Sequence, residues 1–245
     1  MTFISSNEKT DKPVKGYTLH IMQLAPATVA NIKLADGTKL DTCKDARGDC
    51  AQTCIFFSGR GEMPAVWQAR VQRTHDLFLP DGTANPVAVA KLHLEISKLH
   101  ASAKRKRKRL ALRLNGFSDL DFVALLGSDF FSTWKDVQFY DYTKHHGRWL
   151  RYLRGELPTN YDLTFSISEK HTLEEILPIV QQKHARPARC ATVSRTPETM
   201  IDGITYVDGD KHDATFTHPT GTVLVLSAKG KGGSRNPKAS AFIPA

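Results

Sequence analysis

Short apolar runs alternate with helix-like stretches through the second half of the chain, and this alternation constrains the fold most. The apolar runs lie at residues 110–114, 137–142, 161–166, 189–193 and 223–226. Between them lie helix-like stretches at residues 128–134, 147–154 and 173–183. Strands that alternate with helices indicate a parallel sheet built from βα units.

The first hundred residues add one predicted strand and two predicted helices. Tyr17–Leu24 alternates weakly and indicates a strand. Met63–Phe78 and Asn85–Lys104 have apolar residues at helical spacing, and Pro64 suits the first turn of the earlier helix. We therefore expect an α/β fold, a full or partial (β/α) barrel of parallel strands with an N-terminal cysteine loop. A doubly wound open sheet is the alternative.

Length and composition favour one domain. The chain has 245 residues, of which 40% are hydrophobic, and it contains no apolar run long enough to cross a membrane. We expect a flexible polar arm over residues 1–16 and a single α/β domain over residues 17–245. The N-terminus lacks the apolar region of a secretory signal, so we expect a soluble intracellular protein. In a reducing compartment, four cysteines favour metal binding or simple burial over disulfides.

Three of the four cysteines lie within twelve residues. Cys43, Cys50 and Cys54 have the spacing C-x6-C-x3-C. Thiolates are soft ligands that suit zinc and iron–sulfur clusters. We therefore predict that these three side chains bind a metal, with a metal-free cysteine loop as the alternative.

The identity of the metal is open between an iron–sulfur cluster and zinc. Structural zinc sites have four ligands and usually show paired C-x2-C spacing, which this segment lacks. Cys190 is a candidate fourth ligand, but it lies inside an apolar run, where a buried thiol is more common. Three local cysteines fit a 4Fe-4S cluster with one open iron, and this is our preferred interpretation.

Polar residues follow nearly every predicted strand. The carboxyl ends of parallel strands gather at one edge, where the ligand sites of such folds lie. We therefore expect six strand-end residues to converge there, facing the cysteine loop, and to bind a cofactor. They are Asn115, Asp119, Asp141, Lys144, Ser166 and Glu169.

The chain is basic, with a formal net charge of +9 and an isoelectric point near 9.4. Six consecutive basic residues contribute much of this excess: Lys104, Arg105, Lys106, Arg107, Lys108 and Arg109. Such a run attracts polyanions, so we predict that it binds the phosphates of a nucleic acid. A solvated helix end is the alternative.

Two other groups of residues have weaker functional interpretations. His145 and His146 lie near Tyr152 and Tyr161, as in rolling-circle nucleases, but adjacent histidines on a strand point to opposite faces. The region 208–213 holds three aspartates that suit a divalent ion, although a turn rich in Asp and Gly explains them more simply.

Several motifs together resemble one protein family. They are Asp41-Thr42-Cys43, Cys50-x-x-x-Cys54, Phe57-Ser58-Gly59-Arg60-Gly61, Arg113-Leu114-Asn115-Gly116-x-Ser118-Asp119, Val137-x-Phe139-Tyr140-Asp141-Tyr142-Thr143-Lys144, Pro158-x-Asn160-Tyr161-x-Leu163-Thr164-Phe165-Ser166, Val207-Asp208-Gly209-Asp210-x-x-Asp213 and Ser227-Ala228-Lys229-Gly230. In this order they resemble the bacteriophage gene product eighty-eight family, from about residue 16 to the C-terminus. The family itself implies no activity.

More distantly, a cysteine triplet followed by βα units is similar to radical-SAM enzymes. Those enzymes have a partial or full (β/α) barrel, three cysteines on a loop after the first strand, and S-adenosylmethionine on the open iron. The resemblance implies that the loop after Tyr17–Leu24 carries a cluster and that S-adenosylmethionine is the cofactor. The chain departs from the usual C-x3-C-x2-C spacing and has no clear Gly-Gly-Glu motif. These departures bear on the cofactor more than on the cluster.

Two functions are therefore expected, and the sequence leaves the choice between enzyme and binding protein open. The first is an iron–sulfur protein with a radical-SAM-like barrel that acts on nucleic acid or nucleotides in the cytoplasm of the infected bacterium. The second is a basic nucleic-acid-binding protein of phage replication, whose cysteine loop is structural and holds zinc or no metal.

Overall fold

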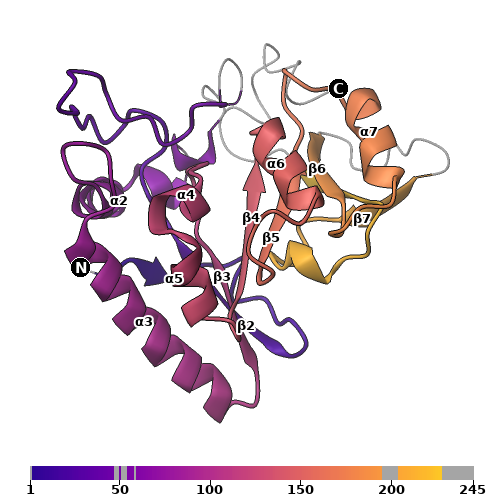
Figure 1. The fold of residues 1–245 in the computed structure, drawn as a ribbon, viewed down its shortest axis with the longest axis horizontal. Helices are drawn as coiled ribbons and strands as arrows, with labels where there is room; N and C mark the ends of the chain where they lie inside the picture. Colours follow the sequence, from indigo (N-terminus) through magenta and orange to yellow (C-terminus); the bar gives the residue numbers. More distant parts are fainter. Residues whose placement is uncertain (1, 47–49, 51–53, 58, 195–203, 228–245) are drawn as a thin grey trace.

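The computed structural model describes residues 2–46, 50, 54–57, 59–194 and 204–227, and the strands of this part form one eight-stranded sheet (Figure 1). The strand order is β1-β2-β3-β4-β5-β6-β8-β7, and every pair is parallel except β1 and β2. The strands are β1 (Ile4–Ser5), β2 (Tyr17–Met22), β3 (Arg109–Arg113), β4 (Gln138–Thr143), β5 (Tyr161–Ser166), β6 (Arg189–Ser194), β7 (Thr205–Asp208) and β8 (Thr222–Ser227). The expected α/β class with a mostly parallel sheet is confirmed.

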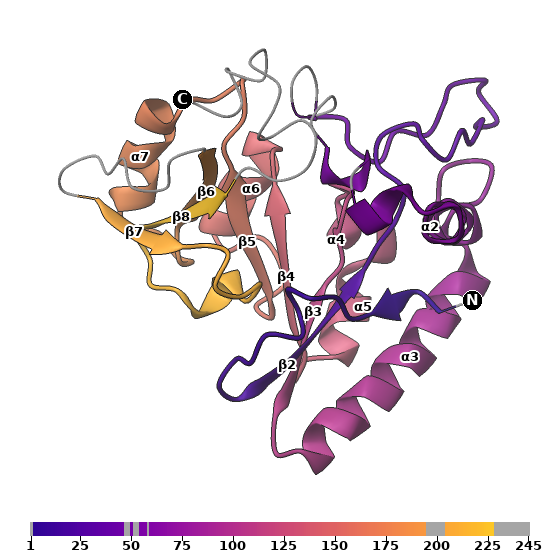
Figure 2. The same cartoon turned by 180° about the vertical axis from the view of Figure 1, so that it is seen from behind.

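The strands from β2 to β6 follow one another in space as they do in sequence. Because connections between parallel strands are right-handed, such an order places the connecting helices on one face of the sheet. In Figure 1, α5 and α6 lie in front of the strands, and in Figure 2 they lie behind them. The helices are α2 (Pro64–Leu77), α3 (Pro86–Arg105), α4 (Phe122–Leu126), α5 (Ser128–Thr133), α6 (His146–Leu153) and α7 (Leu173–Gln181).

The described strands do not close into a full barrel. The edge strands are β1, which has two residues and runs antiparallel to β2, and β7. A closed barrel of this class needs eight parallel βα units, and in the described part of the chain only β2 to β8 are mutually parallel. The sheet order also lacks the central reversal of a doubly wound fold.

The main core lies between the sheet and the helices. Leu112, Phe139 and Leu163 are buried on this side of three neighbouring strands and pack in one cluster with helical side chains such as Leu92 and Trp149. Apolar burial of this kind is the main stabilising term of the fold.

The opposite side of the sheet, which we call the open face, is more polar. A small cluster there contains Leu19, Ala111 and Tyr140 with Ala214 from the connection between β7 and β8. That connection includes the 3-10 turn η3 (Thr215–Thr217). It therefore covers part of the open face, because Ala214 packs against strand residues of that face.

Local signals explain where the helices begin. Asn85 accepts a hydrogen bond from the backbone N–H of Val87, and Pro86 occupies the first position of α3. At α7, Thr172 and Glu175 form a capping box. Each helix begins where a side chain or proline satisfies the unpaired N–H groups of its first turn.

The predicted elements match the described part of the structure within a few residues, with three omissions among its strands and α-helices. The sequence did not predict β1, β7 or α4, which are all short. Inside the predicted arm, β1 pairs with β2, Phe3 is buried in the core, and its backbone N–H donates to Glu95. Among the described helices, none is both long and apolar enough to cross a bilayer.

Candidate metal and cofactor site

The loop after β3 is held to the end of β4 by a buried hydrogen-bond network. Asp141 accepts from the backbone N–H of Asn115 at 2.6 Å, from its side-chain amide at 3.1 Å and from the hydroxyl of Tyr161 at 2.6 Å. The side-chain oxygen Oδ1 of Asn115 in turn accepts from the hydroxyl of Ser118 at 2.8 Å. These polar groups are buried and bound to one another, so they fix the loop in place.

A second network joins the loop after β3 to the start of α6. Asp119 accepts from the backbone N–H of Lys144 at 2.8 Å and forms an ion pair with Arg148. Arg148 also donates to Thr143 at 2.5 Å. Because Arg148 is buried and the Asp119 side chain is only 9% exposed, the pair fixes the backbone around Lys144.

Lys144, Ser166 and Glu169 form the more accessible part of this edge. The Lys144 ammonium donates to the hydroxyl of Ser166 at 2.7 Å. Glu169 is half-buried, and neither of its carboxylate oxygens has a hydrogen-bond partner among the described residues. A carboxylate in this setting is costly unless a cation or donor arrives to pair with it.

Cys43 is anchored to the loop after β3. Its thiol donates a hydrogen bond to the carbonyl of Phe117 at 3.2 Å, and the N–H of Asp119 donates to the carbonyl of Thr42 at 2.7 Å. Burial raises the pKa of the Cys43 thiol to about 12. Without a metal this cysteine is therefore a neutral, hydrogen-bonded thiol.

Cys50 and Cys54 lie at the same edge of the sheet. Burial raises the pKa of the Cys50 thiol, the positive charge of Lys144 lowers it, and the negative charges of Glu169 and Asp119 raise it further. Burial also raises the pKa of Cys54, and the neighbouring Cys50 adds to that rise. The charge of Lys144, which follows β4, thus acts on both thiols.

A buried arginine lies beside the cysteines. The guanidinium of Arg70 lies 4.3 Å from the ring centroid of Phe117 and 5.2 Å from that of Phe56, and the residue is 6% exposed. Its Nη2 donates to Gln23 at 3.4 Å, whereas its Nε and Nη1 have no acceptor within the described part of the chain. Burial lowers the pKa of Arg70, and Cys54 acts in the opposite direction. An anionic group at the cysteines would give this cation the partner it lacks.

In the ranges that the structure describes, no three His, Cys, Asp or Glu side chains are arranged to hold a metal ion. Residues 47–49, 51–53 and 58, which flank Cys50 and Cys54 in sequence, lie outside those ranges. Metal sites are often not preformed, and binding releases the protons of the thiols. A metal at Cys43, Cys50 and Cys54 therefore requires the three sulfurs to converge and the hydrogen bond from Cys43 to Phe117 to break.

The six strand-end residues predicted to bind a cofactor all lie at the edge where the strands β3, β4 and β5 end. They fall into two groups that differ in their exposure and hydrogen bonding. Asn115, Asp119 and Asp141 are engaged in internal hydrogen bonds, whereas Lys144, Ser166 and Glu169 are nearer to the surface. Cofactor binding by any of the six remains a prediction. Arg70 and Arg148 were not predicted, because a helical arginine in sequence gives no signal that its side chain will be buried.

The buried Asp141 carboxyl predicts an unusual dependence of stability on pH. Burial raises its pKa from 3.8 to about 6, although hydrogen bonds from Tyr161 and Asn115 favour the charged form. The folded state therefore binds the proton more tightly than the unfolded chain, and this stabilisation is lost as the pH rises from about 4 through 6. A shift of two units corresponds to about 3 kcal/mol.

We expect the free energy of unfolding of the wild type to fall by about that amount between about pH 4 and pH 7, relative to Asp141→Asn. Urea unfolding at several pH values measures this difference. Parallel curves for the two proteins would mean that Asp141 titrates normally.

The six basic residues lie at the other edge of the sheet. They span the end of α3 and the start of β3, and all six are exposed. In Figure 1 the connection from α3 to β3 lies at the bottom, while β4 points upward to its carboxyl end. Nucleic-acid binding by residues 104–109 remains a prediction, and its surface is separate from the cysteine site.

The alternative sites have other roles in the structure. His145 caps α6 by accepting from the N–H of Arg148. Asp213 is buried and pairs with Arg113 at 3.0 Å, and Asp210 lies 3.9 Å from the ammonium of Lys9. Cys190 belongs to the main core, so the predicted buried thiol is confirmed.

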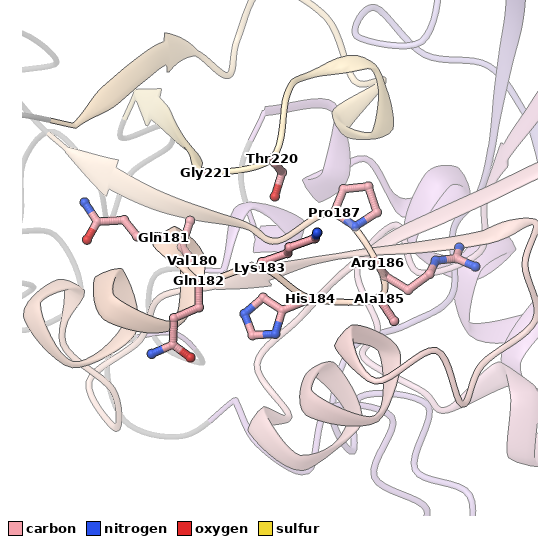
Figure 3. Close-up of a pocket in the computed structure, with 10 residues that line it drawn as sticks. All are labelled: Val180, Gln181, Gln182, Lys183, His184, Ala185, Arg186, Pro187, Thr220 and Gly221. Atoms are coloured by element: carbon pink, nitrogen blue, oxygen red, sulfur yellow. The ribbon is translucent and has the colours of Figure 1, made fainter.

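A surface hollow lies at the end of the sheet where β6 and β8 begin (Figure 3). It is lined by the segment from Val180 to Pro187 and by Thr220 and Gly221. The Arg186 guanidinium donates to the carbonyls of Thr159 and Tyr161, and the His184 ring bonds the carbonyl of Ile179. These groups close a helix end and a turn, so the hollow has a structural explanation.

Comparison with known proteins identifies a family and no close relative of known structure. A family model described as Gene product 88 matches residues 1–243, which confirms the resemblance to the bacteriophage family. No curated protein and no solved structure matches the chain, so the comparisons lend no support to the similarity with radical-SAM enzymes.

Proposed function

The chain belongs to the Gene product 88 family, and from this premise we propose that it is an iron–sulfur protein of bacteriophages. In the proposal, Cys43, Cys50 and Cys54 hold a 4Fe-4S cluster with one open iron. Such a cluster supplies one-electron transfer. S-adenosylmethionine binds at the same edge, and the reaction modifies a nucleic acid or nucleotide.

The observation that carries the proposal is the position of the cysteine segment. Cys43 and Thr42 bond the loop after β3 through Phe117 and Asp119, and the charges of Lys144 and Glu169, which follow the carboxyl ends of β4 and β5, act on Cys50. Ligand sites of parallel α/β folds lie at this edge. The sequential winding of β2 to β6, with helices on one face, is also the winding of a partial (β/α) barrel.

Arg70 supports the anionic character of the site. Three thiolates and a cluster carry net negative charge, and Arg70 has two buried nitrogens, Nε and Nη1, that lack acceptors among the described residues, while the charge of Cys54 raises its pKa. The rings of Phe56 and Phe117 exclude water from the same region. In such a setting a fixed cation favours the thiolate form.

The polar residues of the edge match the charged groups of S-adenosylmethionine. Its amino acid portion carries an ammonium, which Glu169 can pair with, and a carboxylate, which Lys144 can pair with. Asn115, Asp119 and Asp141 act through the backbone, because their hydrogen bonds fix the loops that present these side chains.

Titration of S-adenosylmethionine into anaerobically purified protein tests this assignment. We expect saturable binding to the wild type and at least about tenfold weaker binding to Glu169→Gln, because each lost charge-assisted hydrogen bond costs about 1.5–3 kcal/mol. Glu174→Gln is the matched control, since Glu174 is exposed in the first turn of α7. Equal affinities of wild type and Glu169→Gln would rule out this role for Glu169.

A further inference from the structure

Two residues with buried hydroxyl groups are neighbours on the open face, next to the edge described above. Tyr142 and Thr164 are register partners on β4 and β5. Each lies two residues before a member of the Lys144–Ser166 pair. Because side chains alternate along a strand, the four residues share the open face.

Neither hydroxyl has a hydrogen-bond partner within the described part of the chain. The side-chain oxygens of Tyr142 and Thr164 are both buried, and Thr164 is fully buried as a residue. Leaving a buried hydroxyl unpaired costs free energy, and Phe or Val would fill the same space without that cost. Two such groups on adjacent strands therefore indicate that something outside the described structure pairs with them.

The charged groups next to the Tyr142 ring pair with each other. The guanidinium of Arg113 lies 4.7 Å from the centroid of the Tyr142 ring and donates to Asp213 at 3.0 Å. The hydroxyl of Tyr140 donates to the same carboxylate at 3.1 Å. The charges of Arg113 and Asp213 next to Tyr142 thus pair with each other, and the two unpaired groups themselves are neutral hydroxyls, which favours a ligand that bonds through neutral polar groups.

We infer that Tyr142 and Thr164 bind the hydroxyl groups of a sugar on the open face. Neighbouring strands lie about 4.8 Å apart, so a ligand of the size of one sugar can contact both side chains. Hydroxyls both donate and accept, which suits a ligand of the same kind. The sugar belongs either to a ribonucleoside or to a free carbohydrate, and the site does not depend on a cluster at the cysteines.

Three probes distinguish the sources: adenosine, 2′-deoxyadenosine and ribose, titrated by calorimetry into the whole protein. Adenosine should bind the wild type at least tenfold more tightly than 2′-deoxyadenosine, and this preference should disappear in Tyr142→Phe and Thr164→Val. Binding of ribose alone, with no gain for adenosine, would assign a carbohydrate. If none of the three binds at millimolar concentration, the inference is wrong.

Unfolding by urea gives a second readout and matched controls. Tyr142→Phe and Thr164→Val should leave the urea midpoint unchanged or raise it, because each removes an unpaired hydroxyl. Tyr140→Phe should lower it, since that hydroxyl bonds Asp213. Thr222→Val removes another buried hydroxyl that lacks a partner among the described residues, at the start of β8, and should not change adenosine binding. A fall in the midpoint of Tyr142→Phe equal to that of Tyr140→Phe would show a structural role and overturn the inference.

Discussion

Replacing any one of Cys43, Cys50 and Cys54 by Ala should abolish the visible thiolate-to-iron absorption of anaerobically purified protein. The reason is that a cluster held by three protein thiolates loses a third of its protein ligands with each substitution. Metal affinity at such sites also depends on the sulfurs converging, so the remaining two cysteines should not retain the centre. The loss should be complete in each variant.

Cys190→Ala is the matched control for this experiment. Its thiol lies in the main core, and burial raises its pKa to about 12. The substitution should cost some stability and leave the absorption unchanged. Retention of the absorption in one of the three cysteine variants would remove that cysteine from the ligand set.

The second large effect concerns stability, at the buried ion pair between β5 and β6. Arg189 Nη1 lies 3.1 and 3.0 Å from the two carboxylate oxygens of Asp162, and both residues are almost fully buried. Tyr152 also donates to Asp162 at 2.7 Å. Replacing Asp162 by Asn should lower the free energy of unfolding by about 3–5 kcal/mol, because it leaves the charge of Arg189 buried and unpaired.

The double variant Asp162→Asn with Arg189→Met tests this explanation. It removes both charges, so its free energy of unfolding should lie well above the value expected from adding the two single effects. Urea unfolding of all four proteins gives the coupling energy. A coupling energy near zero would mean that the pair contributes packing alone. Because the pair lies away from Cys43, Cys50 and Cys54 in sequence, the visible thiolate-to-iron absorption should be the same in all four proteins.

The sheet and most helices could be predicted from the sequence because their signals are local. Apolar runs such as Leu110–Leu114 gave the strands, and Pro64 and Asn85 marked helix starts. The gathering of polar residues at one edge also followed, since parallel strands share the direction of their carboxyl ends. Convergence of Asn115 with Asp141 is a direct consequence of that geometry.

Other features depend on contacts distant in sequence and could not be predicted. Nothing in the pattern around Arg70 shows that two phenylalanine rings enclose it. Asn115 and Lys144 carry the same signal, a polar residue after a strand, yet only the first is fully enclosed by its neighbours. Closure of the barrel was also undetermined, because it depends on how many strands pair and not on any single strand.

The central claim is that Cys43, Cys50 and Cys54 hold an iron–sulfur cluster. Analysis of iron, acid-labile sulfide and zinc in protein purified without oxygen tests it most directly. The account predicts about four iron and four sulfide per chain, the composition of a 4Fe-4S cluster, and little zinc. Stoichiometric zinc without iron or sulfide, or protein free of all three, would contradict it.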